Sequence, residues 1–184
     1  MRYFLYSLLL FVITFCKDTI PVLDLQDYFN QRKQRAFITA VQESLHSHGF
    51  FAVKNTEADE VIIESLYEAL ETFFTFDKSL KNEVSGSLSN NQRGYTAIGQ
   101  EAAKGSSVGD LKEFFSMGRS VTPLQAKMQG TWVNIWPDFM DLKGPAESFY
   151  NHIDEYAILF QEIFSKALGK QRHFLRNICK EGDS

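Results

Sequence analysis

The chain has 184 residues, a length that favours one domain. Its 19 lysine and arginine residues against 23 aspartate and glutamate residues give a formal net charge of −4, which argues against a nucleic-acid partner held by phosphate neutralisation. Hydrophobic residues at 44% and charged residues at 23% are typical of a globular protein, and two cysteines, Cys16 and Cys179, cannot form a disulfide framework.

Residues 1–18 form an apolar N-terminal segment. Met1 and Arg2 precede an apolar run at 3–16, which is shorter than the roughly 20 residues that cross a bilayer. A basic start before a short apolar block is typical of a signal peptide, but residues 13–16 lack the small residues of a cleavage site. Two interpretations stay open: a cytoplasmic protein with an apolar extension, and a protein exported or membrane-associated through residues 3–16.

The first part of the remaining chain alternates short apolar runs with amphipathic stretches. The pattern predicts a strand at 20–25, a helix at 36–45, a buried strand at 50–53 and a helix opening at 56–59 and running to 74. Gly49 is placed to close the first helix in a left-handed conformation. The Thr-x-x-Asp sequence at 56–59 has the form of a helix N-terminus.

The second part predicts a polar loop, a pair of extended segments and a long helix. In chain order these are a loop at 85–91, extended segments at 92–98 and 111–118 joined by 99–110, an irregular stretch at 131–137, a helix at 145–168 and a shorter helix at 171–179. The order of strands and helices favours an α+β fold.

Several short motifs follow one another in the order found in a known family. They are Ile20-Pro-Val-Leu-Asp-Leu25, Gly49-Phe-Phe-Ala-Val53, Gln92-Arg-Gly-Tyr95, Asp110-Leu-Lys-Glu-Phe-Phe115 with Gly118, Asn134-Ile-Trp-Pro137, Tyr156, Ala167-Leu-Gly169 and Gly182-Asp-Ser184. As an ordered set they resemble the N-terminal part of the isopenicillin N synthase-like 2-oxoglutarate/Fe(II)-dependent dioxygenases. The resemblance covers residues 19–184.

The resemblance implies the helix-rich N-terminal region of a dioxygenase, with only the first strands of its double-stranded β-helix. Members oxidise small organic substrates with Fe(II), O2 and, in most cases, 2-oxoglutarate. Their His-x-Asp, distant His and Arg-x-Ser motifs, which hold iron and cosubstrate, would lie beyond residue 184. We therefore expect a fragment truncated before the iron-binding barrel, inactive alone, which would act on a small-molecule substrate if the barrel is supplied.

The histidines of the chain do not form a convincing iron site. His152 and Asp154 make a literal His-x-Asp, but on a helix residues two apart point about 200° around the axis, so they do not share a metal ion. The same geometry applies to His46 and His48, and His173 has no acidic or thiol neighbour at ligand spacing. We expect neither Fe(II) nor 2-oxoglutarate to bind this chain tightly.

Arg93 and Tyr95 are the candidate substrate-binding residues. The resemblance places them on an extended segment at the mouth of the active site, where an arginine can bind a carboxylate and a tyrosine can orient a polar group. The alternative is an arginine paired with a surface acid and a tyrosine packed at a sheet edge. Lys112 and Glu113 are interpreted as a solvated strand face.

Two further hypotheses compete with the oxygenase fragment. The first is a non-catalytic truncated protein that acts as a binding or interaction module. The second is a small domain tethered to a membrane by residues 3–16. Whether the chain is an oxygenase fragment or a non-catalytic truncated protein, the helix at 145–168 would present an uncovered apolar face. We expect the chain to self-associate through this face.

Overall fold

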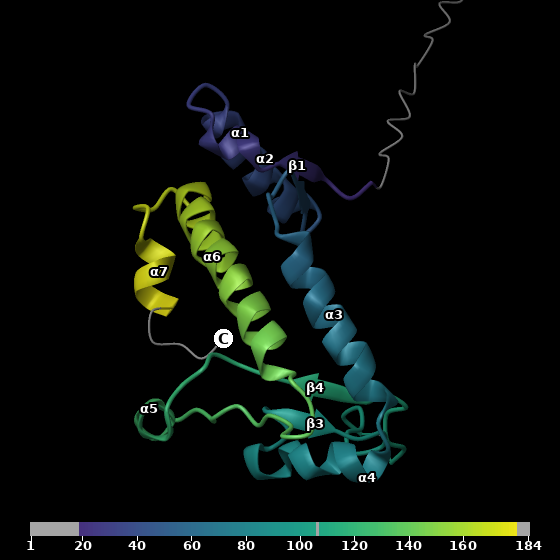
Figure 1. Ribbon diagram of the computed structural model, residues 1–184. Helices are drawn as coiled ribbons and strands as arrows, with labels where there is room; N and C mark the ends of the chain where they lie inside the picture. The colour runs from purple at the N-terminus through teal and green to yellow at the C-terminus, as the bar shows by residue number, and fades with distance from the viewer. Residues whose placement is uncertain (1–18, 106, 180–184) are drawn as a thin grey trace, which may run out of the picture. The chain divides into compact units, whose positions relative to one another are not determined.

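The computed structural model describes residues 19–105 and 107–179, which fall into two compact units divided between Lys54 and Asn55 (Figure 1). The apolar run at 3–16 lies outside the described residues. Across the described part, no helix combines the length and the apolar character needed to cross a membrane. The fold is mixed, with helices predominating over short strands.

The first unit joins two parallel strands through a helical crossover. Its elements are β1 (Val22–Asp24), α1 (Gln26–Phe29), α2 (Gln34–Ser47) and β2 (Ala52–Lys54). Val22 pairs with Ala52 in a parallel register, which requires a crossover connection such as these helices provide. Gly49 has a φ of +80°, and its N–H donates to the Leu45 carbonyl at 3.1 Å. The predicted strand, helix and glycine cap are therefore confirmed.

The expected buried strand at 50–53 is wrong in its burial. The strand begins at Ala52, and Ala52 and Lys54 are exposed while Val53 is half-buried. Phe50 precedes the strand with 54% of its surface exposed. An apolar run of four residues does not by itself distinguish a central strand from one of a two-stranded sheet, and here the strand belongs to a two-stranded sheet.

The second unit carries the long helices and an antiparallel strand pair. Its elements are α3 (Glu60–Thr75), α4 (Lys78–Lys81), the 3-10 turns η1 (Asn82–Val84) and η2 (Gly86–Ser89), β3 (Gly94–Thr96), β4 (Phe114–Ser116), α5 (Pro123–Gln129), α6 (Lys143–Ala167) and α7 (Phe174–Cys179). Tyr95 lies opposite Phe115 in the antiparallel pair. The predicted extended pair and the long helix are confirmed.

Helix α3 begins later than the sequence pattern indicates. Asp59 is its N-cap, and its carboxylate accepts from the N–H groups of Val61 at 2.9 Å and Ile62 at 3.4 Å. Thr56, the expected cap, instead offers its carbonyl to the Tyr156 hydroxyl of α6. A capping motif places the first turn only to within a few residues, because Thr and Asp at either end can both serve as the cap.

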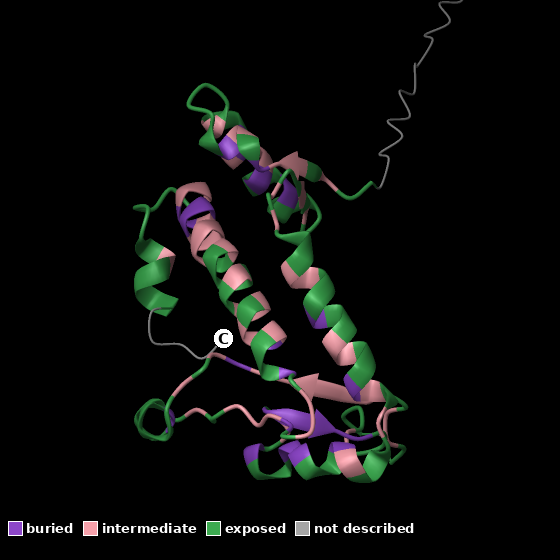
Figure 2. Cartoon of the chain, in the orientation of Figure 1, coloured by how far each residue is buried: buried purple, intermediate pink, exposed green. Residues whose placement is uncertain are grey.

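The core of the second unit surrounds Phe73. A cluster of buried residues is formed by Phe73, Val84, Tyr95, Ala97 and Leu142. The Phe73 ring makes edge contacts with Tyr95 at 5.9 Å and with the half-buried Phe115 at 5.2 Å, measured between ring centroids. All three residues of β3 are buried, and Figure 2 shows the strand in purple. Strand β3 is therefore an interior element.

Two segments differ from the sequence prediction. The expected polar loop at 85–91 contains the turn η2, in which Ser89 is buried and its hydroxyl accepts from the Arg93 N–H at 3.0 Å. Helix α5 is missing from the prediction, although its signal is present in the sequence. Thr122 and Gln125 form a reciprocal capping box around Pro123 at the first helical position.

Candidate functional site

Arg93 is buried immediately before β3. Its Nη1 donates to the Gln92 carbonyl at 2.8 Å and its Nη2 donates to the Thr131 hydroxyl at 3.2 Å. The guanidinium also lies against Gly118, where an added Cβ would come within 2.3 Å of Nη2. Only 5% of Arg93 is exposed, so the structure places it inside the second unit rather than on an open surface.

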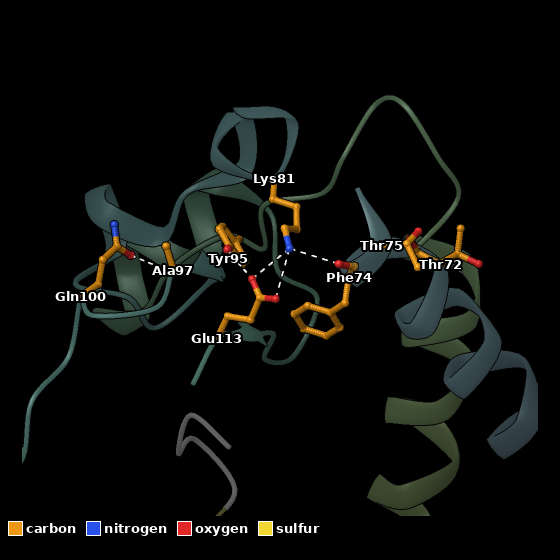
Figure 3. A network of polar contacts seen from close by, with 8 residues as sticks. All are labelled: Thr72, Phe74, Thr75, Lys81, Tyr95, Ala97, Gln100 and Glu113. Atoms are coloured by element: carbon orange, nitrogen blue, oxygen red, sulfur yellow. Dashed lines mark hydrogen bonds and ion pairs between the residues drawn. The ribbon is translucent and has the colours of Figure 1, made fainter. Parts of the chain in front are cut away.

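Tyr95 is buried two residues further along the chain, in the middle of β3. Its ring belongs to the Phe73 cluster, and 1% of the residue is exposed. Its hydroxyl donates to Glu113 Oε2 at 2.5 Å, as Figure 3 shows. The phenol therefore has a charged acceptor within the chain itself.

Lys81, at the end of α4, completes the arrangement. Its ammonium donates to both carboxylate oxygens of Glu113, at 2.9 and 3.1 Å, and to the Phe74 carbonyl at 3.1 Å (Figure 3). It also lies 5.5 Å from the centroid of the Tyr95 ring, within reach of a cation–π interaction. Lys81, Glu113 and Tyr95 are called the Lys81–Glu113–Tyr95 network below.

The network shifts the ionisation of two of its members. Burial and the hydrogen bond to Glu113 raise the pKa of Tyr95 to about 12. The hydrogen bond from Tyr95, followed by that from Lys81, lowers the pKa of Glu113 below its ordinary value. At neutral pH the network thus consists of a carboxylate that accepts from a neutral phenol and from an ammonium group. Such an arrangement holds the two strands and α4 in a fixed geometry.

The interpretation of Lys112 and Glu113 as a solvated face is wrong for Glu113. Lys112 is exposed, and its ammonium lies 3.2 Å from an Asp110 carboxylate oxygen. The Glu113 side chain points the other way, into the network, with 26% of it exposed. Adjacent residues of an extended segment face opposite sides, so this signal was present in the sequence. The role of Lys81 could not be predicted from the sequence, because a four-residue helix is too short to show a periodic pattern.

The structure separates the His-x-Asp pair of α6. His152 Nε2 accepts from the Asp59 N–H at 3.1 Å, which turns the ring toward the start of α3, whereas Asp154 is exposed. The Asp59 contact requires an unprotonated Nε2, so it favours the tautomer with the proton on Nδ1. His152 therefore supports the local structure at the beginning of α3.

The other histidines lie on exposed parts of the chain. His46 is exposed on α2, and His48 Nδ1 lies 2.7 Å from the Ser47 hydroxyl. His173 Nδ1 lies 3.7 Å from the Glu162 carboxylate. Within residues 19–105 and 107–179, no three or more His, Cys, Asp or Glu side chains are grouped so that they could hold a metal ion. The described residues do not fit the donor set of an iron site.

The fold and these motifs agree with a family of oxygenases. A sequence model of the family described as "non-haem dioxygenase in morphine synthesis N-terminal" matches residues 20–139. The chain belongs to this family. It corresponds to the N-terminal region of the isopenicillin N synthase-like 2-oxoglutarate/Fe(II) dioxygenases, as the motifs around Gly49, Arg93 and Asn134 imply.

Curated relatives are oxygenases of about twice the length. The proline hydroxylase buaE of Petromyces alliaceus is 28% identical over 172 residues, which cover 88% of this chain and 52% of the relative. A 2-oxoglutarate-dependent dioxygenase of Didymella fabae is 22% identical over 140 residues, covering 71% of this chain and 42% of the relative. The chain thus spans about half the length of the curated relatives it matches.

Solved structures share the fold over the same portion. A putative 2OG-Fe(II) oxygenase family protein from Caulobacter crescentus superposes with a TM-score of 0.77 and 25% identity, covering 90% of this chain and 53% of that one. A full-length Neurospora crassa protein, solved in complex with alpha-KG, has a TM-score of 0.69 at 22% identity, covering 84% of this chain and 49% of its own. The second likeness shows the fold alone.

Proposed function

We propose that the chain supplies the N-terminal part of a 2-oxoglutarate- and Fe(II)-dependent oxygenase acting on a small organic substrate. The family match over residues 20–139 carries the proposal. The similarity to oxygenases along 88% of the chain supports it. In this proposal β3 and β4 are the first strands of the β-helix, and the catalytic barrel lies outside the described residues.

In this proposal Fe(II) and 2-oxoglutarate are bound by the catalytic barrel and not by the described residues. His152 accepts from the Asp59 N–H and is turned away from Asp154, so this pair does not offer two ligands to one ion. Alone, the chain is then expected to be inactive and to bind Fe(II) only weakly. No step of the oxidation is assigned to its residues.

Arg93 and Tyr95 are proposed to contribute to substrate binding by positioning β3. Because the guanidinium already holds Thr131 and the phenol already holds Glu113, their geometry supports a role in positioning the strand. A direct contact with substrate would require these partners to be exchanged. The two roles can be distinguished by kinetics. Loss of a substrate contact raises KM, whereas loss of a structural contact lowers the amount of folded enzyme.

The test compares the 184-residue chain with the product of its natural transcript. Each is incubated under air with Fe(II), 2-oxoglutarate and ascorbate, which supplies the two electrons when no substrate is oxidised, and conversion of 2-oxoglutarate to succinate and CO2 is measured. We expect conversion with the natural product and none with the chain alone. An anaerobic titration in which the chain alone takes up one equivalent of Fe(II), lost in His152→Ala or His46→Ala, would contradict the assignment of iron to other residues.

A further inference from the structure

A solvent-open cavity of about 330 Å³ lies in the second unit, beside the first turns of α6. Its polar wall comes from Ser120, Gln125, Lys143 and Glu147, and its apolar wall comes from Val133 and Trp136. Figure 1 shows where α5 and the start of α6 lie along the unit. The volume is at the lower end of the range for small-molecule sites, which fits a ligand the size of an amino acid.

Hydrogen bonds hold the walls in place without a ligand. The Asn134 side chain bonds the backbone of Gly118 twice, accepting at 2.9 Å and donating at 2.8 Å. The capping box of α5 fixes Gln125, and the Ser120 hydroxyl donates to Glu147 Oε1 at 2.5 Å. Binding would therefore leave these contacts in place, and the exposed Lys143 side chain is the wall group that it would have to order.

Two opposite charges face this cavity without forming a pair. Lys143 and Glu147 lie one turn apart on α6, a spacing at which such residues commonly form an ion pair. Here Glu147 receives the Ser120 hydroxyl, and the Lys143 ammonium makes no ion pair with any residue that the structure describes. An exposed lysine and a half-buried carboxylate beside an apolar wall match a ligand that carries both charges.

We propose that this cavity binds a free α-amino acid with an apolar side chain. Its carboxylate would meet the Lys143 ammonium and its ammonium would meet the Glu147 carboxylate, both as charge-assisted hydrogen bonds. Its side chain would pack on Trp136 and Val133. The proposal stands apart from the oxygenase function, because it concerns binding by the chain itself.

The test uses the full chain and three matched probes. L-leucine carries both charges, isocaproate lacks the ammonium, and isoamylamine lacks the carboxylate. Binding is followed by nitrogen–proton correlation NMR at the indole N–H of Trp136, which lines the cavity, with the indole of Trp132 as an internal reference. We expect L-leucine to shift the Trp136 signal, and each of the other probes to bind at least tenfold more weakly.

Substitutions test the two charges separately. Lys143→Met and Glu147→Gln should each weaken L-leucine binding at least tenfold, and glutamine keeps an acceptor for Ser120. Lys127→Met, on the exposed surface of α5, is the matched control and should leave binding unchanged. The proposal is overturned if L-leucine leaves Trp136 unshifted, if the three probes bind equally, or if Lys143→Met and the control behave alike.

Discussion

Replacing Lys81 by methionine keeps most of the unbranched side chain and removes its charged end. The substitution removes the hydrogen bonds to both Glu113 oxygens and to the Phe74 carbonyl. Breaking a fully buried ion pair costs about 3–5 kcal/mol, because the remaining charge stays desolvated. Since 7% of the Lys81 side chain and 26% of the Glu113 side chain are exposed, water partly solvates the carboxylate. We expect a loss of about 2–3 kcal/mol in the free energy of unfolding.

Urea unfolding followed by tryptophan fluorescence measures this loss. Trp132 and Trp136 both lie in the second unit, and Trp136 stacks on Phe115 at 5.8 Å, next to the network. The double variant Lys81→Met with Glu113→Gln should be more stable than the sum of the single losses indicates, by about 1–2 kcal/mol. A loss below about 0.5 kcal/mol, as for a surface pair, or additive single variants would refute the reasoning.

Three further predictions concern single residues of the second unit. The lowered pKa of Glu113 means that its ionised form stabilises the fold at neutral pH, and this contribution is lost as the pH falls through the folded-state value. Unfolding free energies measured from neutral pH down to about pH 3 should therefore fall less steeply in Glu113→Gln than in the parent; equal slopes would contradict this. Gly94→Ala should lower the free energy of unfolding in urea by about 2 kcal/mol more than Gly99→Ala. Both glycines have a φ of +80°, but only at Gly94 would the added Cβ meet a backbone atom, because it would lie 2.4 Å from the Val84 carbonyl oxygen. Similar losses in the two variants would show that the close approach is not limiting. Asp59→Ala should lower the free energy of unfolding by about 1 kcal/mol and Asp59→Asn by much less, because asparagine also caps helices. Equal losses of unfolding free energy in the two variants would contradict the capping role of Asp59.

The elements with a clear period could be predicted from the sequence. Helix α6 follows apolar residues at helical spacing, and the predicted 145–168 differs by two residues from Lys143–Ala167 at its start and by one at its end. The sequence also predicts the two extended segments that contain β3 and β4, but not their antiparallel pairing, and it predicts the glycine cap at Gly49. In each case neighbouring residues along the chain determine the local structure.

The candidate site depends on contacts that no local pattern contains. Lys81 and Glu113 are 32 residues apart, and each is an ordinary charged residue in its own segment. The network forms because the fold brings the end of α4 against the start of β4, which is a tertiary outcome. The direction of Glu113 was readable from strand alternation, but its partner was not. For the same reason Arg93 could be expected in a site without any indication of the Thr131 and Gly118 contacts that surround it.

The most direct measurement for the proposed oxygenase is the sequence of the natural transcript past the codon for Ser184. The proposal predicts one open frame that continues with a His-x-Asp motif, a later histidine and an Arg-x-Ser motif, the residues that hold Fe(II) and 2-oxoglutarate in this family. A continuation in the same frame without these motifs, or a transcript in which they appear only in another frame, would contradict it. The chain would then have to act without its own iron centre, as a binding module.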